Sequence, residues 1–313
     1  MLEISEIRFP LGERKSSVWA LTSESQTLLF DSGCREDSKT HIEPALKGLG
    51  VNPRNVQAVI ASHPDVDHFG GAIYWQQEYG AQIIAHRLDA ALMENHETFL
   101  EQRGNEFSRE FRISETEDGL RWLHENGSEV VVNQLIDRDM DYQLGEDQIK
   151  VLHLPGHSRG HLGVLDVKTR TLLISDAVLG SYVPYADGSP SFPPTYRFVK
   201  SYLQTIQRLL LLDFDSLGTA HYGTFSRQGG LRFLQESHDF ALALETTIEG
   251  AIGNEPKTLP EIVEFVDSST GLWPKPSSPA ALAQPVFGHL ELLEEKEVIQ
   301  RVKGSEIGWI KLR

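Results

Sequence analysis

The segment that most constrains this chain is residues 61–71, which hold four potential metal ligands within six positions: His63, Asp65, Asp67 and His68. The apolar run before it, residues 56–61, has the length of a buried strand, and α/β folds place their sites where such strands end. The last two ligands are adjacent, so they cannot point the same way as the first two. The spacing therefore favours two metal ions over one, and the alternative is a polar surface turn with incidental histidines.

Other predicted strands also end at carboxylates or histidines. Residues 27–30 lead into Asp31, which is either a site-orienting residue or part of a simple strand-end turn, and residues 172–175 lead into Asp176 in the same way. A carboxylate that follows a buried strand needs a cation or hydrogen-bond donors nearby. A Pro-Gly turn between two strands carries His157, flanked by His153 and His161, and a strand-like run delivers His221 to a glycine turn. These placements make chance a weak explanation for the first cluster.

Length and composition bound the class of protein. The 313 residues suffice for one large and one small domain, and alternating helical and strand-like runs indicate an α/β or α+β fold. The net charge of −16 disfavours nucleic acid and anionic membranes as partners. A single cysteine, Cys34, excludes an intramolecular disulfide and fits a reducing compartment. We expect a cytoplasmic protein without a secretion signal or a membrane anchor.

Two segments are predicted to wall a substrate pocket. Residues 88–126 form a charged, mostly helical insertion, after which a strand is predicted at residues 129–132. Residues 181–198 form a loop rich in proline and aromatic residues directly after Asp176. A tyrosine hydroxyl in such a loop can donate to a developing oxyanion, and the alternative is that the aromatic residues cover a sheet edge. The candidate substrate contacts are Tyr182, Tyr185, Phe192 and Tyr196.

The C-terminal part has a different texture. Residues 231–252 and 280–295 read as helices, Thr258–Glu261 is a capping box that opens another, and residues 298–311 read as a hairpin. Three helices and a hairpin describe a winged-helix shape, which elsewhere often binds DNA. Residues 231–313 carry 13 acidic and 8 basic side chains, so we predict packing or dimerisation instead.

Taken in order, the motifs resemble those of the metallo-β-lactamase superfamily. That family's His-x-His-x-Asp-His motif corresponds to residues 63–68, and later family motifs match at His157, Asp176 and His221. The resemblance implies a four-layer αββα sandwich over residues 1–228. Residues 229–313 resemble the winged-helix extension of one branch of β-lactamase-like hydrolases.

The resemblance also implies ligand roles. One ion would take His63, His157 and the side chain at position 65, the other would take Asp67, His68 and His221, and Asp176 would bridge them. Asp31 would contact a ligand without binding metal, and His153 and His161 would be structural or orienting groups. Two ions can share a hydroxide whose pKa falls towards about 7, and Asp67 would pass its proton to the leaving group.

We therefore predict a dinuclear metal-dependent hydrolase of a small ester, thioester or lactone, with a possible homodimer. The alternatives are an iron-dependent oxidoreductase, a nuclease or phosphodiesterase, and a non-catalytic binding protein. Zinc is the expected metal. However, Asp65 replaces the family's imidazole and makes the ligand set more anionic, so manganese or iron is expected to support activity at least as well.

Overall fold

The computed structural model describes residues 2–274 and 278–312, and two six-stranded mixed sheets form its centre. The first sheet has the order β1-β2-β3-β4-β5-β6, with strands Glu3–Leu11, Arg14–Ser23, Gln26–Phe30, Val56–Ile60, Gln82–His86 and Gln134–Ile136. The second has the order β14-β13-β10-β9-β8-β7, with strands Gly223–Ser226, Ser216–Thr219, Thr171–Ser175, Leu162–Asp166, Asp147–His153 and Met140–Leu144.

The two sheets pack face to face over an apolar layer. Trp19, Leu28 and Ile60 of the first sheet and Ile149 and Val164 of the second belong to this buried cluster. Alternate side chains of each strand enter it, because successive strand residues point to opposite faces. The remaining faces are covered by helices.

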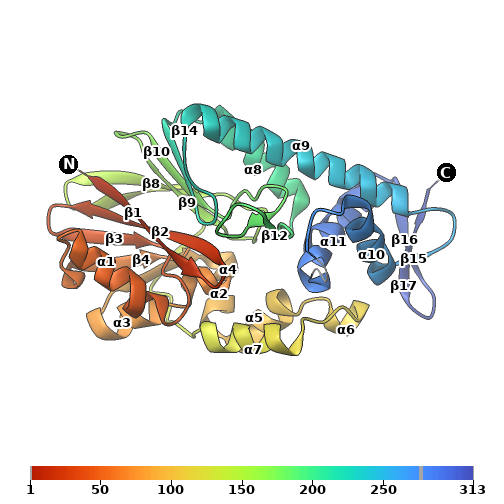
Figure 1. The fold of residues 1–313 in the computed structure, drawn as a ribbon, viewed down its shortest axis with the longest axis horizontal. Coiled ribbons are helices and arrows are strands. Elements are labelled where there is room, and N and C mark those ends of the chain that lie inside the picture. Colours follow the sequence, from red (N-terminus) through yellow and green to blue (C-terminus); the bar gives the residue numbers. More distant parts are fainter. Residues whose placement is uncertain (1, 275–277, 313) are drawn as a thin grey trace.

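Helices complete the four layers (Figure 1). The π-helix η1 (Ser38–Ile42), α1 (Glu43–Gly48) and α3 (Ala72–Tyr79) pack with the first sheet through Trp75, Leu46 and their neighbours. On the second sheet, α8 (Val199–Leu211) and α9 (Arg227–Ala251) bury Ile206 and Leu234. Two short helices, η2 (Pro53–Asn55) and α2 (Val66–Phe69), flank β4. The αββα sandwich expected from the resemblance is therefore present.

The predicted insertion after β5 is helical. It contains α4 (Arg87–Glu94), α5 (His96–Phe99), η3 (Leu100–Gly104), α6 (Ser108–Phe111) and α7 (Glu117–Asn126). The strand predicted at residues 129–132 is wrong, because that segment runs as an irregular connection and the strand β6 begins at Gln134. A backbone hydrogen bond from Asn133 to Ile83 precedes the pairing of β6 with β5.

The C-terminal part continues from α9 with β15 (Lys257–Thr258), α10 (Leu259–Thr270), α11 (Pro279–Glu295), β16 (Ile299–Lys303) and β17 (Ile307–Lys311). The capping box at Thr258 and Glu261 is confirmed, and β16 and β17 form the predicted hairpin. Trp309 and Phe287 join one apolar cluster with Phe107 of the insertion and Ile206 of α8. This part therefore packs against the sandwich, and its winged-helix character stays a prediction.

Within the described ranges, no helix combines the length and apolar character that crossing a bilayer requires.

Candidate metal centre

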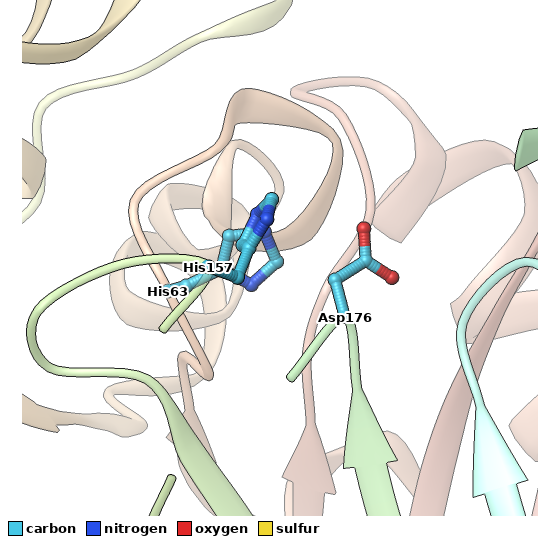
Figure 2. Close-up of side chains that lie close together, drawn as sticks. All are labelled: His63, His157 and Asp176. Atoms are coloured by element: carbon cyan, nitrogen blue, oxygen red, sulfur yellow. The ribbon is translucent and has the colours of Figure 1, made fainter. Parts of the chain in front are cut away.

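Four connections bring the predicted ligands to one edge of the sandwich. Residues 63–68 follow β4, His157 lies in the turn between β8 and β9, Asp176 follows β10, and His221 follows β13. In Figure 2 the imidazoles of His63 and His157 lie together, and the carboxylate of Asp176 lies beside them at the end of its strand. The ligand atoms fall into two groups, each within 4.8 Å: His63, His157 and Asp176, and Asp67, His68 and His221.

The second group has the spacing of ligands around one ion. Asp67 Oδ2 lies 3.5 Å from His68 Nε2 and 3.7 Å from His221 Nε2. Asp176 Oδ2 lies 3.5 and 3.2 Å from the same two nitrogens. Ligand atoms at about 2.0–2.2 Å from a tetrahedral zinc ion are about 3.3–3.6 Å apart. The four side chains therefore fit one divalent ion.

The first group contains buried atoms that lack partners. Within the described residues, His63 Nε2 and Asp176 Oδ1 make no hydrogen bond, and neither does His68 Nε2 of the second group. Such orphaned atoms are uncommon in folded proteins, and a metal ion would supply the missing partner. Because Asp176 Oδ2 faces the second group, its free Oδ1 fits the predicted bridging role.

The imidazoles are held from behind. His63 Nδ1 lies 2.8 Å from Ser62 Oγ, and His221 Nδ1 lies 3.1 Å from the backbone oxygen of Lys15. Such contacts fix the ring and leave Nε2 free to bind a metal. The same logic applies to His68, whose Nδ1 lies 3.1 Å from Asp31 Oδ2.

Asp31 joins three segments of the site. Its Oδ1 accepts a hydrogen bond from Ser62 N at 2.8 Å, and its Oδ2 accepts one from Ser175 Oγ at 2.6 Å as well as contacting His68. Asp31 and Ser175 both have left-handed backbones, with φ of 67° and 48°. Strained residues of this kind persist where surrounding contacts fix them, often at functional sites.

The carboxylates of the second group favour positive charge at its imidazoles. Burial lowers the pKa of His68, but Asp67 and Asp176 more than offset it and hold that pKa well above its ordinary value. Burial likewise raises the pKa of Asp67, and His68 and His221 reverse the effect and lower it. The buried carboxylates therefore favour positive charge at these imidazoles, and a divalent ion bound there would supply such charge.

Asp65 has a partner that the sequence did not reveal. Both of its oxygens accept hydrogen bonds from Arg103 of η3, and Asp65 Oδ2 also lies 3.0 Å from His157 Nε2. The residue belongs to neither of the two ligand groups. Whether it binds metal stays a prediction. Arg103 lies 38 positions away in a charged helical segment, and no local pattern singles it out.

The two histidines that flank His157 in the sequence, His153 and His161, differ in position. His161 is fully buried, and its ring stacks on His63 with 4.8 Å between centroids. His153 instead stacks on His86 and donates to the backbone oxygen of Arg159. Both placements suit structural roles.

A cavity of about 150 Å³ opens onto both ligand groups. The insertion contributes Phe99 and Trp122, and the loop after Asp176 contributes Phe192 and Thr195. Both predicted segments therefore line the cavity. A third wall, which the sequence does not predict, comes from α11 and consists of Ala280, Ala281 and Gln284.

The predicted aromatic contacts separate into three places. Phe192 lines the cavity, whereas Tyr182 and Tyr185 line a second cavity of about 380 Å³ that shares His221 with the first. Tyr196 is fully buried and stacks on Tyr202 with 4.0 Å between centroids. The expectation for Tyr196 is corrected, because its ring is part of the core beneath the loop.

Two curated proteins with known activities are similar to this chain. The acyl-coenzyme A thioesterase MBLAC2 of Gallus gallus has 27% identity over 241 residues, covering 74% of this chain and 80% of the relative. The hydroxyacylglutathione hydrolase GloC of Haemophilus influenzae has 24% identity over 178 residues, covering 56% of this chain and 72% of the relative.

Solved structures share the fold. A metallo-beta-lactamase family protein from Thermus thermophilus superposes with a TM-score of 0.75 at 18% identity, covering 99% of this chain and 98% of that one. A beta-lactamase domain protein from Burkholderia ambifaria gives 0.72 at 18% identity, covering 99% and 92%. The family model described as the metallo-beta-lactamase superfamily matches residues 11–223. The chain therefore belongs to the metallo-beta-lactamase superfamily, and its two buried groups of histidine and aspartate ligands are consistent with the dinuclear site of a hydrolase.

Proposed function

We propose that this protein is a zinc-dependent thioesterase acting on a small-molecule thioester. The observation that carries the proposal is a pair of adjacent ligand groups beside one cavity. Asp176 belongs to the first group, lies 3.5 and 3.2 Å from His68 and His221 of the second, and lines the cavity. Among esters, thioesters and lactones, the thioester is favoured because the similar curated proteins are named for acyl-coenzyme A and hydroxyacylglutathione, which are both thioesters.

Two divalent ions in these groups would polarise the substrate carbonyl and lower the pKa of a water molecule, so that a nucleophile exists at neutral pH. The chain's own groups then handle the proton. The side chain of Asp67 is 14% exposed and that of Asp176 only 7%, and both line the cavity. Asp67 is therefore the carboxylate better placed to take the proton and deliver it to the leaving thiolate.

The experiment measures thiol release. Purified protein loaded with zinc is mixed with acyl-coenzyme A and acylglutathione thioesters, and the free thiol is detected with a disulfide reagent. We expect turnover of at least one thioester, loss of turnover after chelation, and recovery when zinc is added. Hydrolysis of p-nitrophenyl esters or lactones with no thioester turnover would contradict the thioester assignment while leaving a metal-dependent hydrolase.

Arg14 is the cation in the cavity that we expect to meet the substrate. It begins β2, its guanidinium lies 5.6 Å from the centre of the Phe192 ring, and within the described residues it forms no ion pair. Arg103 lines the same cavity but is bound to Asp65. Arg14 is thus free to bind an anionic group of a substrate such as a coenzyme A ester.

Replacing Arg14 with Met is expected to raise KM for acyl-coenzyme A by about 10- to 100-fold and to change kcat little, because a hydrogen bond to a charged group contributes about 1.5–3 kcal/mol. Steady-state kinetics with a charged and an uncharged thioester measure this. Arg109→Met, in an exposed ion pair with Glu101, is the control. An equal rise in KM for the uncharged thioester would show that Arg14 only supports the fold.

A further inference from the structure

Asp65 and Arg103 are joined by two parallel hydrogen bonds, one to each carboxylate oxygen. Arg103 Nε donates to Asp65 Oδ1 at 2.8 Å, and Arg103 Nη2 donates to Asp65 Oδ2 at 2.8 Å. Two parallel hydrogen bonds of this kind fix the plane of the carboxylate as well as its position. Arg103 Nη1 donates to the backbone oxygen of His157 at 2.7 Å, which anchors the guanidinium to a second segment of the site.

The carboxylate held in this way faces the first ligand group. Asp65 Oδ2 lies 3.0 Å from His157 Nε2 and 3.6 Å from His63 Nε2. These distances bracket the separation of about 3.4 Å expected between two ligand atoms on one tetrahedral ion. The carboxylate of Asp65 therefore has the orientation expected of a fourth ligand that binds the same ion as His63, His157 and Asp176.

Charge explains why the arginine is there. An aspartate in place of the family's imidazole adds one negative charge to a buried site, and burying an unpaired charge is costly. Arg103, which is 6% exposed, adds one positive charge beside it. The pair is neutral overall, as an imidazole is.

We propose that Asp65 and Arg103 act as one neutral unit that takes the place of an imidazole ligand at the first metal position. Asp65 supplies the ligand oxygen, and Arg103 is a positioning residue that holds it and cancels its charge. The inference rests on the dinuclear centre of the proposed function, but not on any particular substrate. It also links the helical insertion to the metal site, because Arg103 belongs to η3.

The opposite assignment is that the guanidinium itself fills the first metal position, since Arg103 Nη2 lies 2.9 Å from His157 Nε2. Two observations favour the ligand unit. The guanidinium already has three oxygen acceptors, so it does not depend on the imidazole. In addition, His63 Nε2 and Asp176 Oδ1 have no hydrogen-bond partner in the described structure, so Arg103 does not satisfy the place for a cation between them.

The test counts metal ions and needs no substrate. Each protein is dialysed against buffered zinc, and bound metal is measured by elemental analysis beside the thermal unfolding midpoint. We expect about two zinc ions for the unsubstituted chain. Asp65→His should bind about one, because the unpaired guanidinium then lies beside the site and repels a second cation. The double variant Asp65→His with Arg103→Met should bind about two again, since it restores a neutral imidazole without the guanidinium.

Asp65→Asn, which is closest in shape, is the second variant if the histidine does not fold, and it should also bind about one zinc ion. Arg109→Met, from the same insertion, is the control and should bind about two. Retention of two ions by Asp65→His or Asp65→Asn would overturn the proposal. So would an unsubstituted chain that binds one ion and gains a second in Arg103→Met, because Arg103 would then be shown to block the site. An unsubstituted chain that binds two zinc ions but hydrolyses no thioester would instead count against the proposed function and leave the metal proposal standing.

Discussion

Replacing Asp176 with Asn is expected to remove most of the metal from both groups and to lower thioester hydrolysis by about 10³-fold. Asp176 Oδ2 contacts His68 and His221, and its Oδ1 is free for the first group. An amide lacks the charge that balances two dications. Metal ions supply several kcal/mol of transition-state stabilisation, and each 1.36 kcal/mol corresponds to a factor of about ten. Elemental analysis and the thiol-release assay measure the two effects.

The matched control is Asp166→Asn. Asp166 is also buried, but it caps a turn through Lys168 and Thr169, away from the ligand groups. This variant should keep both metal content and rate. If Asp176→Asn binds as much metal as the unsubstituted chain, the bridging role is wrong.

Replacing Asp31 with Ala is expected to lower the free energy of unfolding by about 3–6 kcal/mol and the affinity for metal by about 10–100-fold. The substitution removes the acceptor of Ser62 N and Ser175 Oγ, and it leaves His68 Nδ1 with only the longer contact to Ser175 Oγ at 3.2 Å among the described residues. It also places alanine at a φ of 67°, a region that alanine rarely adopts. Urea unfolding of the metal-free protein measures stability, and competition with a chelator measures affinity.

Asp31→Asn separates charge from shape. Asparagine tolerates a left-handed backbone and keeps one acceptor oxygen, so it should lose less stability than alanine. Equal unfolding free energies for the alanine variant and the unsubstituted protein would show that Asp31 does not hold these segments together.

The candidate ligands could be predicted from the sequence because they lie in the short connections that follow predicted strands. Short apolar runs place His63, Asp176 and His221 at strand ends, and the two sheets bring those ends to one edge. Asp31 was predictable for the same reason, since a carboxylate after a buried strand needs donors. The fold followed from the order of these motifs more than from any single element.

Contacts between distant segments could not be predicted in this way. The partner of Asp65 lies in a charged helix whose residues look solvent-exposed in sequence, yet Arg103 is buried. The C-terminal part was expected to pack or dimerise, but nothing in its pattern indicated that Ala280 and Gln284 would line the cavity. The sequence of a loop does not indicate which of its aromatic side chains face a pocket and which face the core. Tyr196 therefore could not be distinguished from the other aromatic residues of its loop.

Arg103 also changes the reasoning about the metal. The carboxylate of Asp65, considered alone, makes the ligand set more anionic and favours manganese or iron. The guanidinium cancels the added charge, so the basis for that preference is weaker, and zinc, which generally binds such sites more tightly, is the metal we propose.

Two metal ions bridged by Asp176 are expected in the two ligand groups. A crystal structure of the zinc-loaded protein, with anomalous diffraction recorded at the zinc absorption edge, tests this most directly. We predict one anomalous peak between His63, His157 and Asp176 and a second between Asp67, His68 and His221, with Asp176 in contact with both. Absence of zinc from both positions, or zinc bound elsewhere in the chain, would contradict it.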